Sequence, residues 1–328
     1  MQLLLLPLPN NPSKSSFVCL CVIPLYRLSI LITQYCFQMK VTGFSFICNA
    51  VKNDYPIAEA IKSILPICDE FLIAVGDSED GTLALIESIN SPKIKIIHTV
   101  WDNSIREGGR TFALETDKAF AAISADTDWA FYIQGDECVH EKYLPALKKA
   151  MEVNLNDKQV EGLLLKYLHF YGSYNYYGDS RRWYRREIRI IRNNRAIHSY
   201  RDAQGFRISD RKLKVKLIDA YVYHYGWVKP PNGLVRKGMN FNLFYYKNAV
   251  ETVIPETAEF DYGNADNMKL FTGTHPEVML PRIKAVNWEY TFDPTKVKSS
   301  DSLRRRLLQK FYEWTGIRVG EYRNYRII

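Results

Sequence analysis

The chain has 328 residues, of which 47% are hydrophobic and 24% charged. This composition excludes a disordered or fibrous protein, and the length suffices for a large α/β domain that folds without disulfides or zinc. Lys and Arg outnumber Asp and Glu by 44 to 36, which favours anionic partners without choosing among them. The six cysteines lack CxxC spacing, so we expect a reducing, cytosolic compartment.

The first 38 residues differ from the rest of the chain. They contain two basic residues and no acid, and the stretch 17–37 is long enough to cross a bilayer. Pro24 and Arg27 interrupt that stretch, and a central arginine is costly in a membrane. Three interpretations stay open: a membrane anchor, a signal or presequence, and an upstream extension of the reading frame before Met39. We favour the extension.

From residue 41 onward, apolar runs alternate with segments of helical spacing. The pattern predicts strands at 41–48, 70–75, 93–100 and 129–133, and helices at 57–65, 82–89 and 110–122. Such alternation predicts a largely parallel sheet, and ligands of these sheets bind beyond the carboxyl ends of the strands. Polar clusters fall at those ends, at 49–54, 76–80 and 134–137.

The pattern changes beyond residue 160. Further strands are expected at 162–170, 187–192 and 215–225, followed by helical segments from 229 and a basic helix at 302–314. We therefore predict three regions: the hydrophobic N-terminal extension 1–38, a main domain at 39–228, and a helical C-terminal region at 229–328 with a basic amphipathic tail.

The turn Gln134–Glu137 carries the clearest chemical signal. Two acids at the end of a buried strand are costly unless they bind a cation, accept hydrogen bonds or act on a substrate. Mg²⁺ and Mn²⁺ commonly use one or two carboxylates together with substrate phosphates. Alternatively, Asp136 and Glu137 cap a helix near residues 141–151.

The order of the strands and turns that ends with this turn resembles the order found in the GT-A glycosyltransferases, specifically the family 2-like inverting enzymes. The resemblance covers roughly residues 41–226. It implies a GT-A (Rossmann-like) α/β fold, with a mixed, mainly parallel central sheet flanked by helices and a helical C-terminal extension.

The resemblance also implies the residues of a nucleotide-sugar site and its divalent metal ion, Mg²⁺ or Mn²⁺. The nucleotide-sugar would be bound by Asn49, Asn53, Asp77, Asp80, Arg110 and Gln134. Asp136 and His224 would hold the metal. Gln134 stands where the family has the first Asp of its D-x-D turn, so metal dependence is less firmly implied than the fold.

Inverting transfer needs a base that accepts the proton of the acceptor hydroxyl. Asp202 is the first candidate and Glu137 the second, whereas a loop Asp that bonds its own backbone is the ordinary alternative for Asp202. The arginine-rich stretch 181–192 suits phosphate oxygens, although alternating Ile188 and Ile190 also fit a strand whose arginines point into solvent.

These features together predict a hexosyltransferase-type enzyme that passes a sugar to a cell-surface glycan or lipid-linked acceptor. It would serve cell-envelope polysaccharide synthesis in the cytoplasm, at the inner face of the membrane, where the basic tail helix makes a peripheral contact. A catalytically impaired GT-A scaffold and a basic nucleic-acid-binding module are the alternatives. The second lacks any recognised nucleic-acid-binding signature, so we expect no nucleic acid partner.

Overall fold

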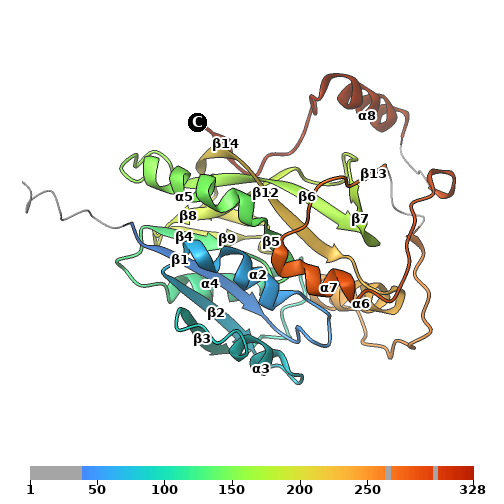
Figure 1. Cartoon of the computed structure of the whole chain (residues 1–328), viewed down its shortest axis with the longest axis horizontal. Helices are drawn as coiled ribbons and strands as arrows, with labels where there is room; N and C mark the ends of the chain where they lie inside the picture. Colours follow the sequence, from blue (N-terminus) through green and yellow to red (C-terminus); the bar gives the residue numbers. More distant parts are fainter. Residues whose placement is uncertain (1–38, 263–266, 298–301) are drawn as a thin grey trace, which may run out of the picture. The chain divides into compact units, whose positions relative to one another are not determined.

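A computed structural model of the chain describes residues 39–262, 267–297 and 302–328. The three interpretations of residues 1–38 concern a segment that lies outside the described residues. Most of the described chain belongs to one mixed sheet and the helices that cover it (Figure 1).

In the ranges that the structure describes, fourteen strands form two sheets. Their bounds are β1 (Val41–Ile47), β2 (Glu70–Gly76), β3 (Ile94–Thr99), β4 (Trp129–Tyr132), β5 (Glu137–Val139), β6 (Gly162–Tyr171), β7 (Ser173–Gly178), β8 (Arg186–Arg192), β9 (Ile197–Tyr200), β10 (Gly205–Ile208), β11 (Arg211–Lys212), β12 (Lys214–Trp227), β13 (Met268–Leu270) and β14 (Arg326–Ile327).

The α-helices of the described ranges differ widely in length. Their bounds are α2 (Ile57–Ile64), α3 (Thr82–Glu87), α4 (Arg110–Ala121), α5 (Leu144–Val153), α6 (Pro231–Tyr245), α7 (Leu280–Lys284) and α8 (Leu303–Thr315). Within these same ranges, none of the helices combines the length and the apolar character needed to cross a membrane.

The main sheet joins a parallel part to a part rich in antiparallel pairs. Strands β3, β2, β1 and β4 are neighbours in that order and run parallel. β8 then lies antiparallel to both β4 and β6, and the long strand β12 runs parallel to β6 and antiparallel to β5. The three strands β9, β10 and β11 make a separate small sheet.

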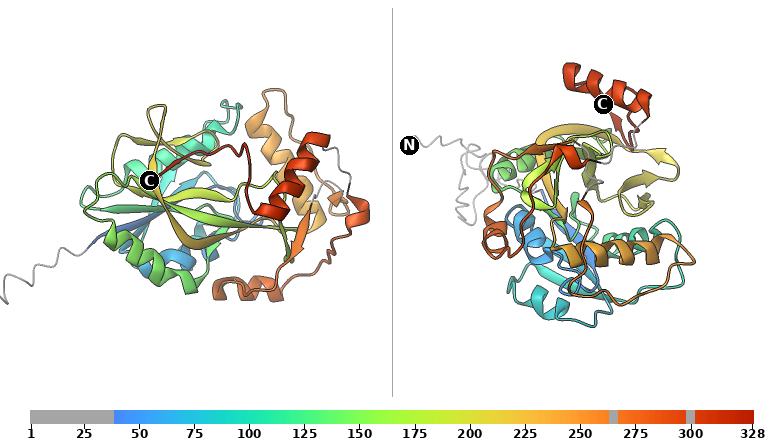
Figure 2. Two further views of the ribbon diagram at one scale, coloured as in Figure 1. Left: turned by 90° about the horizontal axis from the view of Figure 1, so that it is seen from above. Right: turned by 90° about the vertical axis from the view of Figure 1, so that its right-hand side faces the viewer.

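Both faces of the parallel part are covered, which explains why its strands are apolar runs rather than alternating patterns. All seven residues of β2 are buried. Phe71 and Ile73 pack in one core with residues of α2 and α5, whereas Leu72 and Ala74 point to the other face, toward Phe120 of α4. Figure 2 shows the covered sheet from two further sides.

The predicted fold class is confirmed: a mixed α/β architecture with a central sheet flanked by helices. Every strand and helix predicted between residues 41 and 133 is present within two residues of its expected bounds. The predicted boundary at residue 228 stays a prediction, although β13 and β14, which lie beyond it, join the main sheet.

Two local expectations are corrected. Asp136 and Glu137 do not begin a helix, because Glu137 opens the short strand β5 instead. The arginine-rich strand β8 is not a solvated face either. Its five central residues are buried, since β4 and β6 flank it on both sides, and Arg189 has no exposed surface.

Candidate active site

The turn after β4 brings Asp136 next to His224. β5 starts directly after this turn and pairs antiparallel with β12, with Glu137 opposite His224. The Nε2 atom of His224 lies 3.5 Å from Oδ2 of Asp136, and both side chains are nearly buried. The sheet register therefore joins the two residues that the sequence proposed as metal ligands.

Two lysines supply positive charge to Asp136. The ammonium group of Lys237, on α6, lies 3.4 Å from Asp136 Oδ2 and donates a 2.8 Å hydrogen bond to the Gly226 carbonyl. Lys229 also acts on Asp136 and is more deeply buried; burial and the nearby Lys237 lower its own pKa to about 7. Burial acts to raise the pKa of Asp136, but His224, Lys237 and Lys229 outweigh it and hold that pKa below its ordinary value. Asp136 is therefore an anion among basic side chains, and we call Asp136, His224, Lys229 and Lys237 the Asp136 cluster.

Hydrogen bonds fix the proton positions on His224. His169 Nε2 lies 2.8 Å from the Tyr184 carbonyl and must donate to it, which leaves His169 Nδ1 as an acceptor. Burial and the nearby His224 hold the pKa of His169 well below its usual value, so this ring is neutral. The two Nδ1 atoms are 3.4 Å apart, so the network assigns the donor to His224 Nδ1, while the other ring nitrogen, Nε2, faces Asp136.

The geometry fits a divalent cation held by Asp136 and His224. A carboxylate suits Mg²⁺ or Mn²⁺, and neutral imidazole is a common metal ligand. Their 3.5 Å separation is close to the ~3 Å between adjacent ligands of an ion bound at about 2.1 Å. A side chain would not fit at residue 226, because a Cβ there would clash with Asp136, His224 and Lys237.

Two protein ligands are few for such an ion. In the part of the chain that the structure describes, no group of three or more His, Cys, Asp or Glu side chains is placed to hold a metal. The remaining ligands would have to come from a substrate or water, as is usual for Mg²⁺ at phosphate-binding sites.

Glu137 is a structural residue, which corrects its assignment as the second candidate base. Its carboxylate has no exposed surface and pairs with Arg189 through contacts of 2.7 and 2.8 Å. Tyr167 also donates to it over 2.7 Å, and the Gln134 backbone amide over 3.1 Å. A carboxylate that is fully enclosed and paired in this way has no access to an acceptor hydroxyl.

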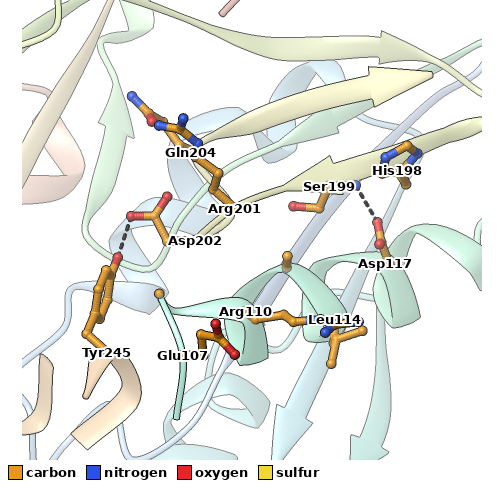
Figure 3. A pocket seen from close by; sticks show the side chains of 12 residues that line it. Glu107, Arg110, Leu114, Asp117, His198, Ser199, Arg201, Asp202, Gln204 and Tyr245 are labelled. Atoms are coloured by element: carbon orange, nitrogen blue, oxygen red, sulfur yellow. Dashed lines mark hydrogen bonds between the residues drawn. The ribbon is translucent and has the colours of Figure 1, made fainter. Parts of the chain in front are cut away.

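Asp202 lines a cavity of about 670 Å³. The walls come from the start of α4, the turn between β9 and β10, and the end of α6 (Figure 3). The charged and polar side chains that line it include Arg110, Asp117, His198, Arg201, Asp202 and Tyr245. The cavity therefore contains the predicted base and the predicted nucleotide-binding arginine.

The backbone around Asp202 is strained. Arg201 and Ala203 have positive φ angles of 58° and 63°, a conformation that costs free energy in residues other than glycine and often marks functional sites. The hydroxyl of Tyr245 donates to Asp202 Oδ2. Burial and Asp202 both raise the pKa of Tyr245, so its hydroxyl stays protonated and remains a donor.

Gln134 links the Asp136 turn to the Asp202 turn. Its Nε2 donates a 3.2 Å hydrogen bond to the Ala203 carbonyl, and Arg189 Nη2 lies 3.4 Å from its Oε1. Asp136 is not among the residues that line the cavity. The predicted residues therefore form two groups, the Asp136 cluster and the cavity of Asp202, with Gln134 between them.

Two of the proposed nucleotide-binding side chains bind the backbone of neighbouring loops. Asn49 Oδ1 accepts a 2.9 Å hydrogen bond from the Glu79 amide. Asp80 accepts from the amides of Lys52, at 2.7 Å, and Thr82, at 3.0 Å. These bonds join the loop after β1 to the loop after β2, so Asn49 and Asp80 hold the two loops together.

The other proposed nucleotide-binding residues are spread over different segments. Asn53 accepts a hydrogen bond from Asn240 of α6 through its side chain, and its carbonyl accepts from Lys229 over 2.8 Å. Asp77 and Arg110 are both exposed. Arg110 lines the cavity, whereas Asp77 does not. The structure therefore does not bring these two side chains together in one cavity.

The structure adds four residues that the sequence did not single out: Lys229, Lys237, Tyr245 and Glu187. Lys237 and Tyr245 lie on α6, where nothing in the sequence marks a lysine or a tyrosine as part of a distant site. Glu187 lies in the arginine-rich strand and is buried, with Gln204 donating to it over 2.9 Å. Burial raises the pKa of Glu187 to about 8, against the opposing effects of Arg189 and Gln204.

Comparison with known proteins gives only distant likenesses. No protein-family model and no curated protein sequence matches the chain. Among solved structures, glucosyl-3-phosphoglycerate synthase from Mycobacterium tuberculosis, in complex with Mn²⁺, uridine-diphosphate and phosphoglyceric acid, matches with 18% identity, 40% of this chain, 44% of that chain and a TM-score of 0.28.

Two other solved structures match more of the chain. S. aureus TarS matches with 15% identity, 62% of this chain, 39% of that chain and a TM-score of 0.36. The 4-diphosphocytidyl-2C-methyl-D-erythritol synthase from Anaerococcus prevotii matches with 10% identity, 63% of this chain, 96% of that chain and a TM-score of 0.37.

The chain spans less than half of the first two of these structures. Because all three TM-scores are low, these matches carry no argument. The GT-A-like fold is inferred instead from the chain's own strand order, in which parallel β3, β2, β1 and β4 are followed by antiparallel β8.

Proposed function

We propose that the chain is a glycosyltransferase that moves a sugar from a nucleotide-diphosphate sugar to an acceptor hydroxyl with inversion. One observation carries the proposal: Gln134, in the turn that carries Asp136, donates a hydrogen bond to the strained turn of Asp202, which lines a cavity. A cationic cluster suits a leaving diphosphate, and an adjoining half-buried carboxylate suits a base.

In the proposed reaction Asp202 accepts the proton of the acceptor hydroxyl. The hydroxyl oxygen bonds to the anomeric carbon from the face opposite the diphosphate, the bond between that carbon and the diphosphate oxygen breaks, and the nucleotide diphosphate leaves. Tyr245, which donates to Asp202, orients the carboxylate. Lys237 and Lys229 neutralise the charge that develops on the leaving group.

Asp136 and His224 would hold a divalent cation, Mg²⁺ or Mn²⁺. When bound, such a cation supplies positive charge to the diphosphate oxygens. Lys237 must then give up part of its contact with Asp136, and its ammonium group can turn to the same diphosphate. Nucleotide base, donor sugar and linkage stay open in this proposal, and the acceptor is a glycan or lipid-linked hydroxyl at the cytoplasmic face of the membrane.

A screen of nucleotide diphosphates by thermal shift, with and without Mn²⁺, tests the donor site. One nucleotide should raise the melting temperature, and more so with the metal, because a ligand that binds only the folded state stabilises it. In the Asp136→Asn variant, the additional rise in melting temperature that the metal causes should disappear. Asp210→Asn, a change at an exposed turn, is the matched control. Full metal-dependent stabilisation of the Asp136 variant would refute the metal assignment.

The base is tested with the nucleotide-sugar that this screen identifies. Asp202→Asn should keep the nucleotide-dependent thermal shift and lower turnover by about 10² to 10⁴-fold, the usual contribution of a general base. Unchanged turnover would eliminate Asp202. Nucleotide binding without turnover of any nucleotide-sugar, slow hydrolysis included, would favour the catalytically impaired scaffold.

A nucleic-acid-binding function receives no support from the arginine-rich stretch. Arg189 is buried against Glu137, and Arg185 forms a two-bonded pair with Glu321. Arg192 donates to backbone carbonyls, including that of Val160 at 3.1 Å. These arginines hold the fold together and offer little free charge to a phosphate backbone.

A further inference from the structure

Helix α8 turns its polar side toward the rest of the fold. Tyr312 donates a 3.2 Å hydrogen bond to Asp179, and Gln309 donates to the carbonyl of the same residue over 3.4 Å. Asn267 donates to Glu313 over 3.1 Å. These contacts show which side of the helix bears on the protein.

The apolar side of α8 faces solvent. Leu303, Leu307, Phe311 and Trp314 are 66%, 59%, 38% and 84% exposed. Their spacing of four, four and three residues places them within about 80° of one another around the helix, at ~100° per residue. None of the residues of α8 is buried, so the helix does not serve to pack an apolar face onto its own chain.

Positive charge borders this apolar stripe on both sides. Arg304 lies along one edge, and Arg306 and Lys310 lie along the other, at the same ~100° per residue. All three are exposed. The helix has one acid, Glu313, which lies on the side that contacts the protein.

We propose that α8 is a docking surface for a membrane that contains anionic lipids. An amphipathic helix with Trp and Leu on one face and basic residues beside them inserts its apolar face at the headgroup boundary, while the basic residues attract acidic headgroups. The helix lies to one side of the sheet in Figure 2, and its polar contacts keep the apolar stripe outward. The proposal does not depend on transferase activity.

A second copy of the chain is a poorer occupant of the stripe. Two copies related by a two-fold axis would bring the same basic borders together, and like charges in close contact disfavour such pairing. An acidic bilayer complements both the apolar stripe and its borders. The charge pattern therefore selects the membrane.

Flotation of the full-length protein with lipid vesicles tests this. The protein should float with vesicles of phosphatidylcholine mixed with phosphatidylglycerol, and at least about tenfold less with phosphatidylcholine alone, because the basic borders need acidic headgroups. Added salt should weaken the binding.

Variants of the helix identify the surface. Leu307→Glu with Trp314→Glu should lower binding to the acidic vesicles by at least about tenfold, because each replaces an inserting side chain with a carboxylate. Val250→Glu with Val253→Glu adds the same charge at residues that are 75% and 95% exposed outside α8 and should bind as the unchanged protein does. Residues 1–38 are common to all variants and cannot cause a difference.

Thermal unfolding checks that each variant is folded. The proposal is overturned if the unchanged protein stays free of acidic vesicles, or if both double variants bind equally. A concentration-dependent dimer that only the α8 variant abolishes, without vesicle binding, would overturn it in favour of an interface between two copies. Loss of transferase activity with intact vesicle binding would leave it standing, which separates its failure from that of the proposed function.

Discussion

At the scale of single residues, Gly226 decides whether the Asp136 cluster has room for a ligand. We expect Gly226→Ala to abolish the metal-dependent rise in melting temperature, because the added methyl group would meet Asp136, His224 and Lys237. Gly238→Ala is the matched control, since a Cβ at that glycine of α6 would meet nothing within 4 Å. Equal metal responses of the two variants would contradict the assignment of the space above Gly226.

The buried carboxyl group of Glu187 should make the free energy of unfolding depend on pH. Burial raises its pKa in the folded protein to about 8, against an ordinary value of 4.5, so the folded state binds the proton more tightly than the unfolded state does. The contribution of Glu187 to stability is therefore fully present below about pH 4.5 and is lost as the pH rises to about 8.

Glu187→Gln should remove this dependence. Between about pH 5 and pH 8, the free energy of unfolding of the unchanged protein should fall by a few kcal/mol more than that of the variant, since each unit of pKa difference is worth about 1.4 kcal/mol. Denaturation in urea across this range measures it. Parallel pH profiles of the two proteins would show that Glu187 is ionised in the folded state at neutral pH.

At the scale of elements, the pair of Arg189 and Glu137 fastens β8 to β5. Both side chains are fully buried, so either one left alone is an unpaired buried charge. Arg189→Met and Glu137→Leu should each lower the free energy of unfolding by about 3 to 5 kcal/mol, whereas the double variant should cost less than the sum of the two.

Urea titrations of the three variants measure this coupling. Glu137→Leu also removes the hydrogen bond from Tyr167. This loss is present in both the Glu137 single variant and the double variant, so it cancels when the two are compared. Simple additivity of the two single effects would mean that Glu137 and Arg189 do not act as a pair.

Helix α6 is the element that joins the two halves of the candidate site. Lys237, in its middle, contacts Asp136, and Tyr245, at its end, contacts Asp202. The carbonyls of Phe244 and Tyr245 accept hydrogen bonds from the amides of Gly109 and Gly108, just before α4. A movement of α6 would therefore alter both groups together.

At the scale of the whole described molecule, the last residues of the chain tie back to the middle of the sequence. β14 pairs with β12, and Glu321 forms a two-bonded pair with Arg185. Arg207 donates to the Asn324 carbonyl over 2.6 Å. The C-terminal segment thereby fastens both the main sheet and the small sheet that presents Asp202.

The sequence by itself determined the alternation of strands and helices, because apolar periodicity is local. It also singled out Asp136, Asp202 and His224, whose roles stay predictions; the pairing of β5 with β12, which no local pattern specifies, brings Asp136 and His224 together. The same reasoning failed for Glu137 and for the arginines of β8, since side chains distant in sequence decide whether a charge is paired.

Only the tertiary structure decided which charges remain available. Arg189 closes off Glu137, Lys237 reaches Asp136 from a helix that carries no motif, and Gln134 links the turn of Asp136 to the turn of Asp202. For α8, the sequence predicts the amphipathic pattern but not the direction in which the apolar face points. That direction follows from polar contacts with Asp179 and Asn267, which no local pattern specifies.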